Sequence, residues 1–211
     1  MDEQPSGRRR FTMLRSFVGA DFLTIGNAAC GMAAIFCCLK FMEGQNPAYM
    51  WAAFALLPIS LLFDMLDGFI ARWRHKHSAL GADLDSLADI VSFGVAPAVI
   101  GYTLGMQGVW DTVVLVFFVV CGIARLARYN ATSASMGGES GKVTHYEGAP
   151  IPTSLILVIL LAASYATGNV GVGELWGGAW KIGPWTLHAM TLAYAVSGSA
   201  MVSATLRIPK P

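Results

Sequence analysis

The stretch DMLDGFIARWRHKHSALGADLDSLAD, residues 64 to 89, decides how this chain is interpreted. It contains five of the thirteen acidic residues, at Asp64, Asp67, Asp83, Asp85 and Asp89, among leucine, phenylalanine, alanine and isoleucine residues. Ionisable groups inside apolar segments are costly, so they mark candidate functional sites. We therefore expect a site for charged ligands within an apolar environment.

The rest of the chain is strongly apolar. Of its 211 residues, 55% are hydrophobic and 13% charged, whereas about 25% are charged in an average soluble domain. A helix crosses the bilayer core in about 20 apolar residues. Six segments approach this length: 22–43, 49–71, 79–104, 108–129, 150–168 and 185–207. We predict a single domain, residues 1–211, that is an all-α integral membrane protein with a bundle of six transmembrane helices.

The basic residues are distributed unevenly along these segments. With six spans, Lys40 and Lys181 lie on one side of the membrane, and the other twelve of the fourteen lie on the opposite side with both termini. The positive-inside rule makes that side cytoplasmic, in a bacterial or archaeal cell membrane or a eukaryotic internal membrane. Residues 1–20 are expected to be cytoplasmic or interfacial. Arginines mixed with apolar residues at 8–20 favour an interfacial amphipathic helix, with a frayed basic tail as the alternative.

The aspartates fall on two helical faces. Helical spacing in the second span groups Asp64, Asp67, Gly68, Ala71 and Arg72, and in the third span it groups Gly81, Asp85 and Asp89. A short connection joins the two antiparallel spans, so both faces converge near the cytoplasmic boundary. Carboxylates this close cannot all ionise without compensation, and bound Mg²⁺, Mn²⁺ or Ca²⁺ would supply it. The small residues on these faces leave room for a phosphate-bearing ligand such as a nucleotide.

The pattern Asp64-xx-Asp67-Gly68-xx-Ala71-Arg72, eight residues, Gly81-xxx-Asp85-xxx-Asp89 resembles the signature of the CDP-alcohol phosphatidyltransferase family at every position. The resemblance extends over nearly the whole chain and implies a homodimer. It implies two divalent cations, Mg²⁺ or Mn²⁺, bound by Asp64, Asp67, Asp85 and Asp89. Asp89 would also be the catalytic general base. The implied CDP site comprises Asp64, Asp67, Gly68, Ala71, Arg72, Gly81 and Asp85.

Residues 85–98, 122–130 and 148–152 resemble the phosphatidylserine synthase branch, although Ala149 replaces an expected leucine. The resemblance implies that the phosphatidyl group of CDP-diacylglycerol is transferred to L-serine. Arg125 and Arg128 would bind the serine carboxylate or a lipid phosphate, or else anchor the helix end by snorkelling. Tyr129 is assigned to the same acceptor site. Ser92 is assigned there too, with a structural bond to its own helix as the alternative.

Several alternatives stay open at this point. The signature alone also allows glycerol phosphate or inositol phosphate as the acceptor. A cation or amino-acid transporter is a remote possibility, because intramembrane carboxylates can form ion paths, but transporters usually bind near the midplane between repeats. A net charge of +1 without a basic stripe speaks against nucleic-acid binding.

Two features lie outside the signature. Asp83 is expected on the side of its helix opposite Asp85. His75-Lys76-His77 is expected to be a basic loop near the membrane surface.

Overall fold

The computed structural model describes residues 19–74, 79–136, 145–171, 175–203 and 207–209. Side chains are described within these ranges except at 19–20, 71–74, 79–80, 133–136, 145–147 and 207–209. The amphipathic helix predicted in residues 8–20 and the loop from His75 to His77 therefore lie outside the described residues, apart from the first residues of the helix that begins at Gly19.

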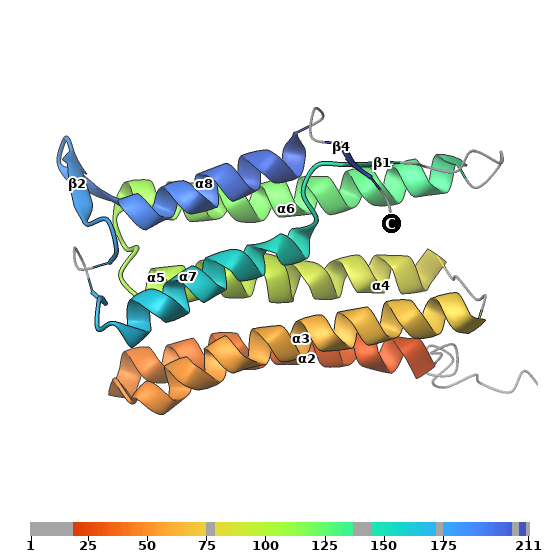
Figure 1. Cartoon of the computed structure of the whole chain (residues 1–211), viewed down its shortest axis with the longest axis horizontal. Helices are drawn as coiled ribbons and strands as arrows, with labels where there is room; N and C mark the ends of the chain where they lie inside the picture. Colours follow the sequence, from red (N-terminus) through yellow and green to blue (C-terminus); the bar gives the residue numbers. More distant parts are fainter. Residues whose placement is uncertain (1–18, 75–78, 137–144, 172–174, 204–206, 210–211) are drawn as a thin grey trace, which may run out of the picture.

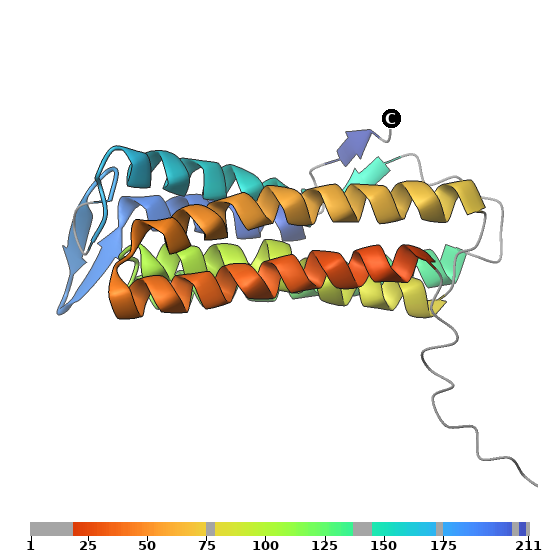
Figure 2. The same cartoon turned by 90° about the horizontal axis from the view of Figure 1, so that it is seen from below.

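The described chain is a bundle of helices aligned along the long axis of the molecule (Figures 1 and 2). In chain order the helices are α2 (Gly19–Gly44), α3 (Pro47–Arg74), α4 (Ala79–Asp89), the π-helix η1 (Ile90–Val95), α5 (Ala96–Thr103), α6 (Val109–Met136), the 3₁₀ helix η2 (Ile151–Ser154), α7 (Leu155–Ala166) and α8 (Ala189–Val202). The strands are β1 (His145–Glu147), β2 (Ala179–Ile182), β3 (Trp185–His188) and β4 (Arg207–Pro209). They form two antiparallel pairs, β1 with β4 and β2 with β3.

Four helical stretches are long and apolar enough to cross a membrane: Asp21–Gly44, Pro47–Ile70, Gly81–Thr103 and Val109–Thr132. They match the first four predicted spans. A helix suits this environment because it satisfies all its backbone hydrogen bonds internally. Large apolar side chains such as Phe22, Phe36 and Phe69 are more than half exposed on the bundle surface. Such a surface suits contact with lipid, so the protein is described below as a membrane protein.

The last two predicted spans are shorter than expected. Apolar helices occupy Ile151–Ala166 and Ala189–Val202, and both are below the length of the four long spans. The sixth prediction, 185–207, is wrong at both ends. Residues Trp185–His188 form β3, because Gly183 has a φ of +67° and turns the chain into a hairpin with β2. After Val202 the chain leaves the helix and β4 follows at Arg207–Pro209.

The third span is the centre of the bundle. Within the apolar windows of the four long spans, 56% of its residues are buried, against 28–33% for the other three. Its middle is the π-helix η1, where the Ala96 backbone N–H donates to the carbonyl of Val91. Pro97 follows directly and has no N–H to continue an α-helical ladder. The backbone is therefore widened over the turn that precedes Pro97.

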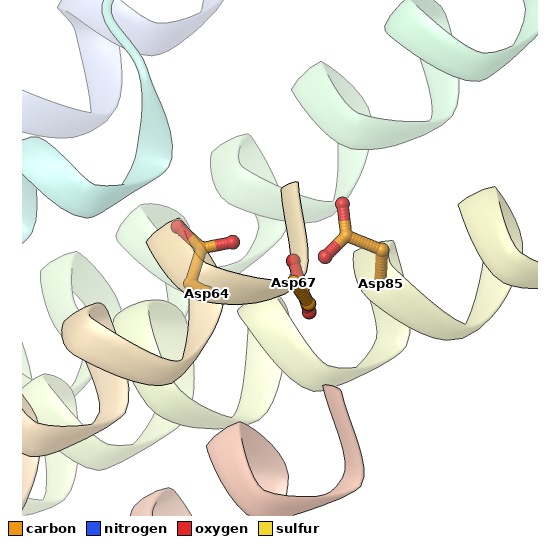
Figure 3. A group of neighbouring side chains, drawn as sticks. All are labelled: Asp64, Asp67 and Asp85. Carbon is orange, nitrogen blue, oxygen red and sulfur yellow. The ribbon is translucent and has the colours of Figure 1, made fainter. Parts of the chain in front are cut away.

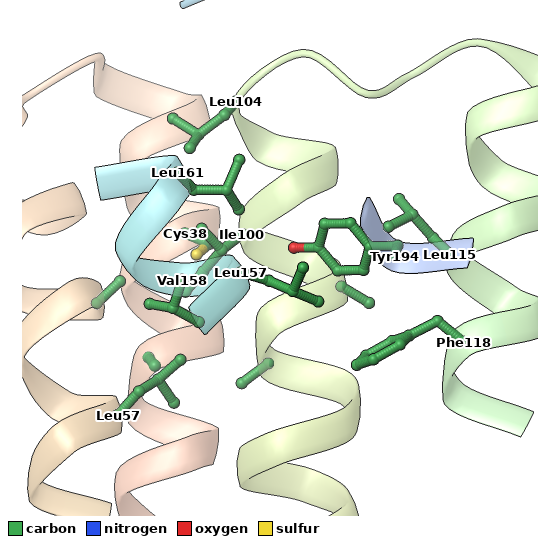
Figure 4. Close-up of a cluster of buried hydrophobic side chains, with 14 of the residues drawn as sticks. Cys38, Leu57, Ile100, Leu104, Leu115, Phe118, Leu157, Val158, Leu161 and Tyr194 are labelled. Atoms are coloured by element: carbon green, nitrogen blue, oxygen red, sulfur yellow. The ribbon is translucent and has the colours of Figure 1, made fainter. Parts of the chain in front are cut away.

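A core of buried hydrophobic side chains joins α2 and α3 to α5, α6, α7 and α8 (Figure 4). Tyr194 of α8 is fully buried, and its hydroxyl donates to the Pro97 carbonyl at 2.6 Å. Its ring packs edge-on against Phe118 of α6, with centroids 5.2 Å apart. Leu161 of α7 completes this layer. Tyr194 thus joins the C-terminal helix to the central span by both packing and a hydrogen bond.

α2 crosses the central span at very short range. A Cβ atom added to Gly31 would lie 2.7 Å from the Cα atom of Ser92 in η1. Side-chain carbon atoms do not approach backbone this closely, so the crossing requires glycine. The hydroxyl of Ser92 uses the proximity to donate to the Asn27 carbonyl on α2, at 2.9 Å.

The β2–β3 end of the bundle contains a buried carboxylate outside the aspartate-rich stretch. Asp111, in the first turn of α6, accepts hydrogen bonds from the His188 backbone N–H at 2.8 Å, the Thr191 hydroxyl at 2.6 Å and the Gly108 N–H at 3.0 Å. Its Oδ2 lies 2.6 Å from Nδ1 of His188. The cluster joins the start of α6 to the start of α8. Trp110 and Trp185 pack edge-on nearby, and exposed tryptophans are typical of membrane interfaces.

Replacing Gly31 by alanine is expected to destabilise the protein by about 1–3 kcal/mol, the usual cost of overpacking. The measurement is thermal unfolding of the purified protein in detergent micelles. Gly44→Ala is the matched control, because a Cβ atom there meets nothing within 4 Å. Equal melting temperatures for Gly31→Ala and Gly44→Ala would show that the close crossing is not required.

Replacing Asp111 by alanine is expected to cost about 3 kcal/mol or more, because it leaves several buried donors without their acceptor. The melting temperature in detergent should fall by several degrees. The control is Glu43→Ala, which removes the exposed Lys40–Glu43 ion pair and should change stability little. A variant at Asp111 as stable as the wild type would contradict a structural role for the cluster.

Candidate active site

Three aspartates from two helices converge in the half of the bundle away from the β2–β3 hairpin. Asp64 and Asp67 come from α3 and Asp85 from α4, and each offers a carboxylate oxygen within 4.8 Å of the other two (Figure 3). Asp67 is buried, and the other two are half-buried. The helical spacing i, i+3 places Asp64 and Asp67 on one face of α3, and the antiparallel neighbour supplies the third carboxylate. These residues, named together below as the aspartate trio, match the predicted convergence.

The trio has the chemistry of a site for a hard divalent cation. Its ligand atoms are all carboxylate oxygens, which Mg²⁺, Mn²⁺ and Ca²⁺ prefer. The Oδ1 atom of Asp85 is buried and has no hydrogen-bond partner among the described residues. Buried polar atoms are rarely left unsatisfied, so this oxygen is suited to bind an ion. The residues present therefore fit a metal site.

Asp89 lies one helical turn beyond Asp85 and is not a member of the trio. It is the last residue of α4, directly before η1, and only 7% of its surface is exposed. Asn27 of α2 donates from Nδ2 to its Oδ1 at 3.1 Å. The carboxylate predicted to be the general base is thus buried and held by a neutral donor from a different helix.

α2 also reaches the trio itself. The hydroxyl of Thr24 donates to Oδ2 of Asp67 at 2.7 Å. Thr24 and Asn27 are both buried and lie three residues apart on one face of α2, within residues 22–39, which are otherwise apolar. Neither residue was among the predicted site residues. The sequence contained a signal for these two contacts, because two polar residues at helical spacing in a membrane span require buried partners.

Ser60 and Ser92 complete a polar junction around Asn27. The Ser60 hydroxyl of α3 makes a short hydrogen bond to Oδ1 of Asn27. Ser92 is fully buried, and its hydroxyl is committed to the Asn27 carbonyl. The structural alternative foreseen for Ser92 was a bond within its own helix, but the bond made here joins two helices. An acceptor role for Ser92 stays a prediction.

The structure describes the positions of all the predicted nucleotide-binding residues along their helices, but the side chains of only some of them. Gly68 follows Asp67 on α3, and Gly81 lies one turn before Asp85 on α4, so both sit beside the trio along the chain. Ala71 and Arg72 continue α3, which ends at Arg74. The side chains of Ala71 and Arg72 lie outside the described residues.

Asp83 is separated from the trio, as its spacing predicts. It is exposed, and Asn130 of α6 donates from Nδ2 to its Oδ1 at 3.4 Å. The same Nδ2 donates to the Ser86 hydroxyl at 3.0 Å. Asp83 and Ser86 therefore join α4 to α6, on a different face from the carboxylates that converge with α3.

Three of the four predicted acceptor residues, Arg125, Arg128 and Tyr129, lie on the part of α6 that runs beside α4. A Cβ atom on Gly122 would lie 3.2 Å from Cδ1 of Ile90, and Asn130 contacts Ser86. Arg125 stands between these two contacts, so the backbone at Arg125 runs beside the turn that carries Asp89. Arg125 is half-buried. Arg128 and Tyr129, one turn farther along α6, are exposed.

Comparison with known proteins agrees with the kind of site that this geometry indicates. The family model for CDP-alcohol phosphatidyltransferase matches residues 17–197. The CDP-diacylglycerol--serine O-phosphatidyltransferase of Saccharomyces cerevisiae is 39% identical over 208 residues, covering 98% of this chain and 75% of the yeast protein. The enzyme of the same name from Mycobacterium tuberculosis is 32% identical over 94% of this chain and 64% of its own length. An archaetidylserine synthase of Methanothermobacter thermautotrophicus is 33% identical over 74% of this chain and 61% of its own length.

A solved structure supports the fold. The phosphatidylinositol phosphate synthase of Mycobacterium tuberculosis, crystallised with CDP-DAG bound, aligns with a TM-score of 0.52 and 21% identity. The alignment covers 90% of this chain and 84% of that one. Similarity at this level of identity concerns the arrangement of helices.

Replacing Asp85 by asparagine is expected to have opposite effects with and without metal. Without metal, the melting temperature should rise or stay constant, because one of several crowded negative charges is removed. The stabilisation produced by Mn²⁺ should require at least about 10-fold more metal, because a ligand is lost. Thermal unfolding across a Mn²⁺ titration measures both effects.

Asp83→Asn is the matched control for this titration. It removes the same charge from the same helix but lies outside the trio. Equal Mn²⁺ dependence for Asp85→Asn and the wild type would rule out Asp85 as a metal ligand.

Proposed function

The chain belongs to the CDP-alcohol phosphatidyltransferase family, and we propose that it transfers the phosphatidyl group of CDP-diacylglycerol to the hydroxyl of L-serine, releasing CMP. The observation that carries the choice of serine is the 39% identity to the yeast serine enzyme over 98% of the chain. The converging carboxylates of α3 and α4 supply the chemistry. Family membership also removes the support for the transporter hypothesis.

Asp64, Asp67 and Asp85 would hold divalent metal, with Asp89 as a further ligand, and Mg²⁺ or Mn²⁺ are the ions of choice. Bound metal would neutralise the diphosphate of the nucleotide lipid and stabilise the leaving CMP. Oδ1 of Asp85 supports this assignment, because no side chain or backbone group in the described part of the chain bonds to it. A second ion, as the family signature implies, belongs to the same proposal.

The chain's own residues would bind the nucleotide through the adjoining helix faces. Gly68 and Gly81 carry no side chain, so the CDP moiety can approach the backbone of α3 and α4. Ala71 leaves further space, and Arg72 would offer a cation to phosphate oxygens. These four residues together with the aspartate trio form the proposed CDP site.

Asp89 would act as the general base. The serine hydroxyl oxygen forms a bond to the phosphatidyl phosphorus, the bond from that phosphorus to the CMP oxygen breaks, and the hydroxyl proton passes to the Asp89 carboxylate. The Asn27 amide engages Oδ1 of Asp89. This leaves Oδ2 as the oxygen to meet the acceptor hydroxyl.

Arg125 and Arg128, with Tyr129 and Ser92, form the proposed acceptor site. The course of α6 past Asp89 supports Arg125 in particular, because its guanidinium can pair with a serine carboxylate within reach of the base. Glycerol phosphate and inositol phosphate present phosphate to the same cations, so arginine alone does not exclude them. The acceptor assay below separates these substrates.

The membrane placement belongs to the same proposal. Helices Ile151–Ala166 and Ala189–Val202 span about 24 and about 21 Å at 1.5 Å per residue, so they could complete six crossings with a tilted or locally thinned bilayer. The distribution of arginine and lysine supports a cytoplasmic active site and cytoplasmic termini. A homodimer is proposed from family membership.

The test is CMP release by the purified full-length chain given CDP-diacylglycerol and Mn²⁺ or Mg²⁺, with and without L-serine. Release should require both serine and metal. Asp89→Asn should lower kcat by about 100-fold or more, because general-base catalysis contributes at least that much. Asp83→Asn, on the same helix but outside the cluster, should retain nearly full activity.

Two outcomes would change the proposal. Release with glycerol phosphate or inositol phosphate in place of serine would keep the mechanism and reassign the acceptor. An Asp89→Asn variant as active as the wild type would refute the assignment of the base while leaving the transfer reaction intact.

A further inference from the structure

α2 carries no residue of the family signature, yet its buried polar residues contact two of the signature aspartates. Thr24 is 5% exposed and Asn27 is fully buried, in a stretch of α2, residues 22–39, that is otherwise apolar. A buried polar group stabilises the fold only when it is paired. Both side chains find their partners in carboxylates on other helices, Thr24 in Asp67 and Asn27 in Asp89.

The orientation of the Asn27 amide is determined by its neighbours. Nδ2 faces Oδ1 of Asp89 at 3.1 Å, and Oδ1 receives the Ser60 hydroxyl. In the reversed orientation the amide oxygen would face the Asp89 carboxylate, and two acceptors would repel each other. Asn27 therefore presents a donor to Asp89.

The main chain of Asn27 is held as firmly as its side chain. Its carbonyl accepts the Ser92 hydroxyl at 2.9 Å, from η1, just beyond Asp89. Gly31, one turn along α2, permits this contact because a Cβ atom there would lie 2.7 Å from Ser92 Cα. Asn27 thus joins α2, α3 and the central span at one point, so its amide has a fixed position relative to Asp89.

From this geometry we propose that Asn27 is a positioning residue for Asp89, and that Thr24 has the same role for Asp67. The inference rests on the proposed function, in which Asp89 is the base and a metal ligand and Asp67 a metal ligand. Asn27 occupies Oδ1 of Asp89 and directs Oδ2 toward the reacting groups. Thr24 occupies Oδ2 of Asp67 and leaves Oδ1 for metal. Each residue bonds to a carboxylate, Thr24 to Asp67 and Asn27 to Asp89, and would act through it.

The test compares Asn27→Leu with the wild type in detergent micelles. Leucine has nearly the same size and keeps the backbone carbonyl that Ser92 uses, but it cannot donate to Asp89. The expected result is a kcat lower by about 10- to 100-fold, the usual cost of losing a group that orients a ligand, with a KM for serine changed less than about threefold. The Mn²⁺ concentration for half-maximal thermal stabilisation, measured without substrate, should rise about 10-fold.

Thr24→Val tests the second contact and serves if Asn27→Leu does not fold. Valine has the shape of threonine without its hydroxyl, so the donation to Asp67 is lost. The Mn²⁺ requirement should again rise about 10-fold. The matched control is Ser164→Ala, which removes the bond from the buried Ser164 hydroxyl to the Asn169 carbonyl, away from every aspartate. It should change the melting temperature only.

A purely structural role for α2 predicts a different pattern. Both variants would then lower the melting temperature, while the kcat of the folded protein and its Mn²⁺ requirement stayed at wild-type values, and that result would overturn the inference. A wild-type protein that releases no CMP with any acceptor would refute the proposed function alone. The Mn²⁺ titrations would still decide the roles of Asn27 and Thr24, because they need no substrate.

Discussion

Carboxylate groups crowded inside an apolar helical bundle impose the constraint on which the rest of this structure depends. Asp64, Asp67 and Asp85 bring oxygen atoms within 4.8 Å of one another in a protein whose outer surface suits lipid. Burial and mutual repulsion both oppose their ionised forms. A buried carboxylate is stabilised when it accepts hydrogen bonds or binds a cation. The chain supplies donors from α2, and Oδ1 of Asp85, which has no partner among the described side chains, is the position that a cation would satisfy.

The close contacts between helices follow from this requirement. Donors on α2 can reach the carboxylates only if α2 lies against the central span, and Gly31 makes that approach possible. The π-helix begins directly after Asp89, and Pro97 follows it. π-Helical turns occur frequently at functional sites, and this one lies where Asp89, the polar junction and the α6 contact meet. Packing and chemistry are therefore concentrated in one layer of the bundle.

The two ends of the bundle handle buried charge differently. At the β2–β3 end, Asp111 is surrounded by the donors of Gly108, His188 and Thr191. Both oxygen atoms of this carboxylate accept hydrogen bonds, and the carboxylate joins α6 to α8. At the other end, donors among the described side chains satisfy the trio only in part. Asp111 is therefore a structural aspartate, whereas the aspartates of the trio are available to bind a ligand. All four are acidic residues in apolar surroundings.

The spacing of Asp64, Asp67, Asp85 and Asp89, with the apolar runs around them, was sufficient to predict the family, the four long spans and the convergence of α3 with α4, because helical periodicity is a local property. The same periodicity separated Asp83 from Asp85. Span length at the C-terminal end could not be predicted, because composition does not distinguish the apolar strand Trp185–His188 from the start of a helix. Which residues contact the carboxylates depends on which helices cross each other and on the distance between those helices. Asn27, Thr24 and Ser60 are 33 to 62 residues away from the groups they contact, so only the tertiary structure, through the close approach at Gly31, decides that α2 orients the site.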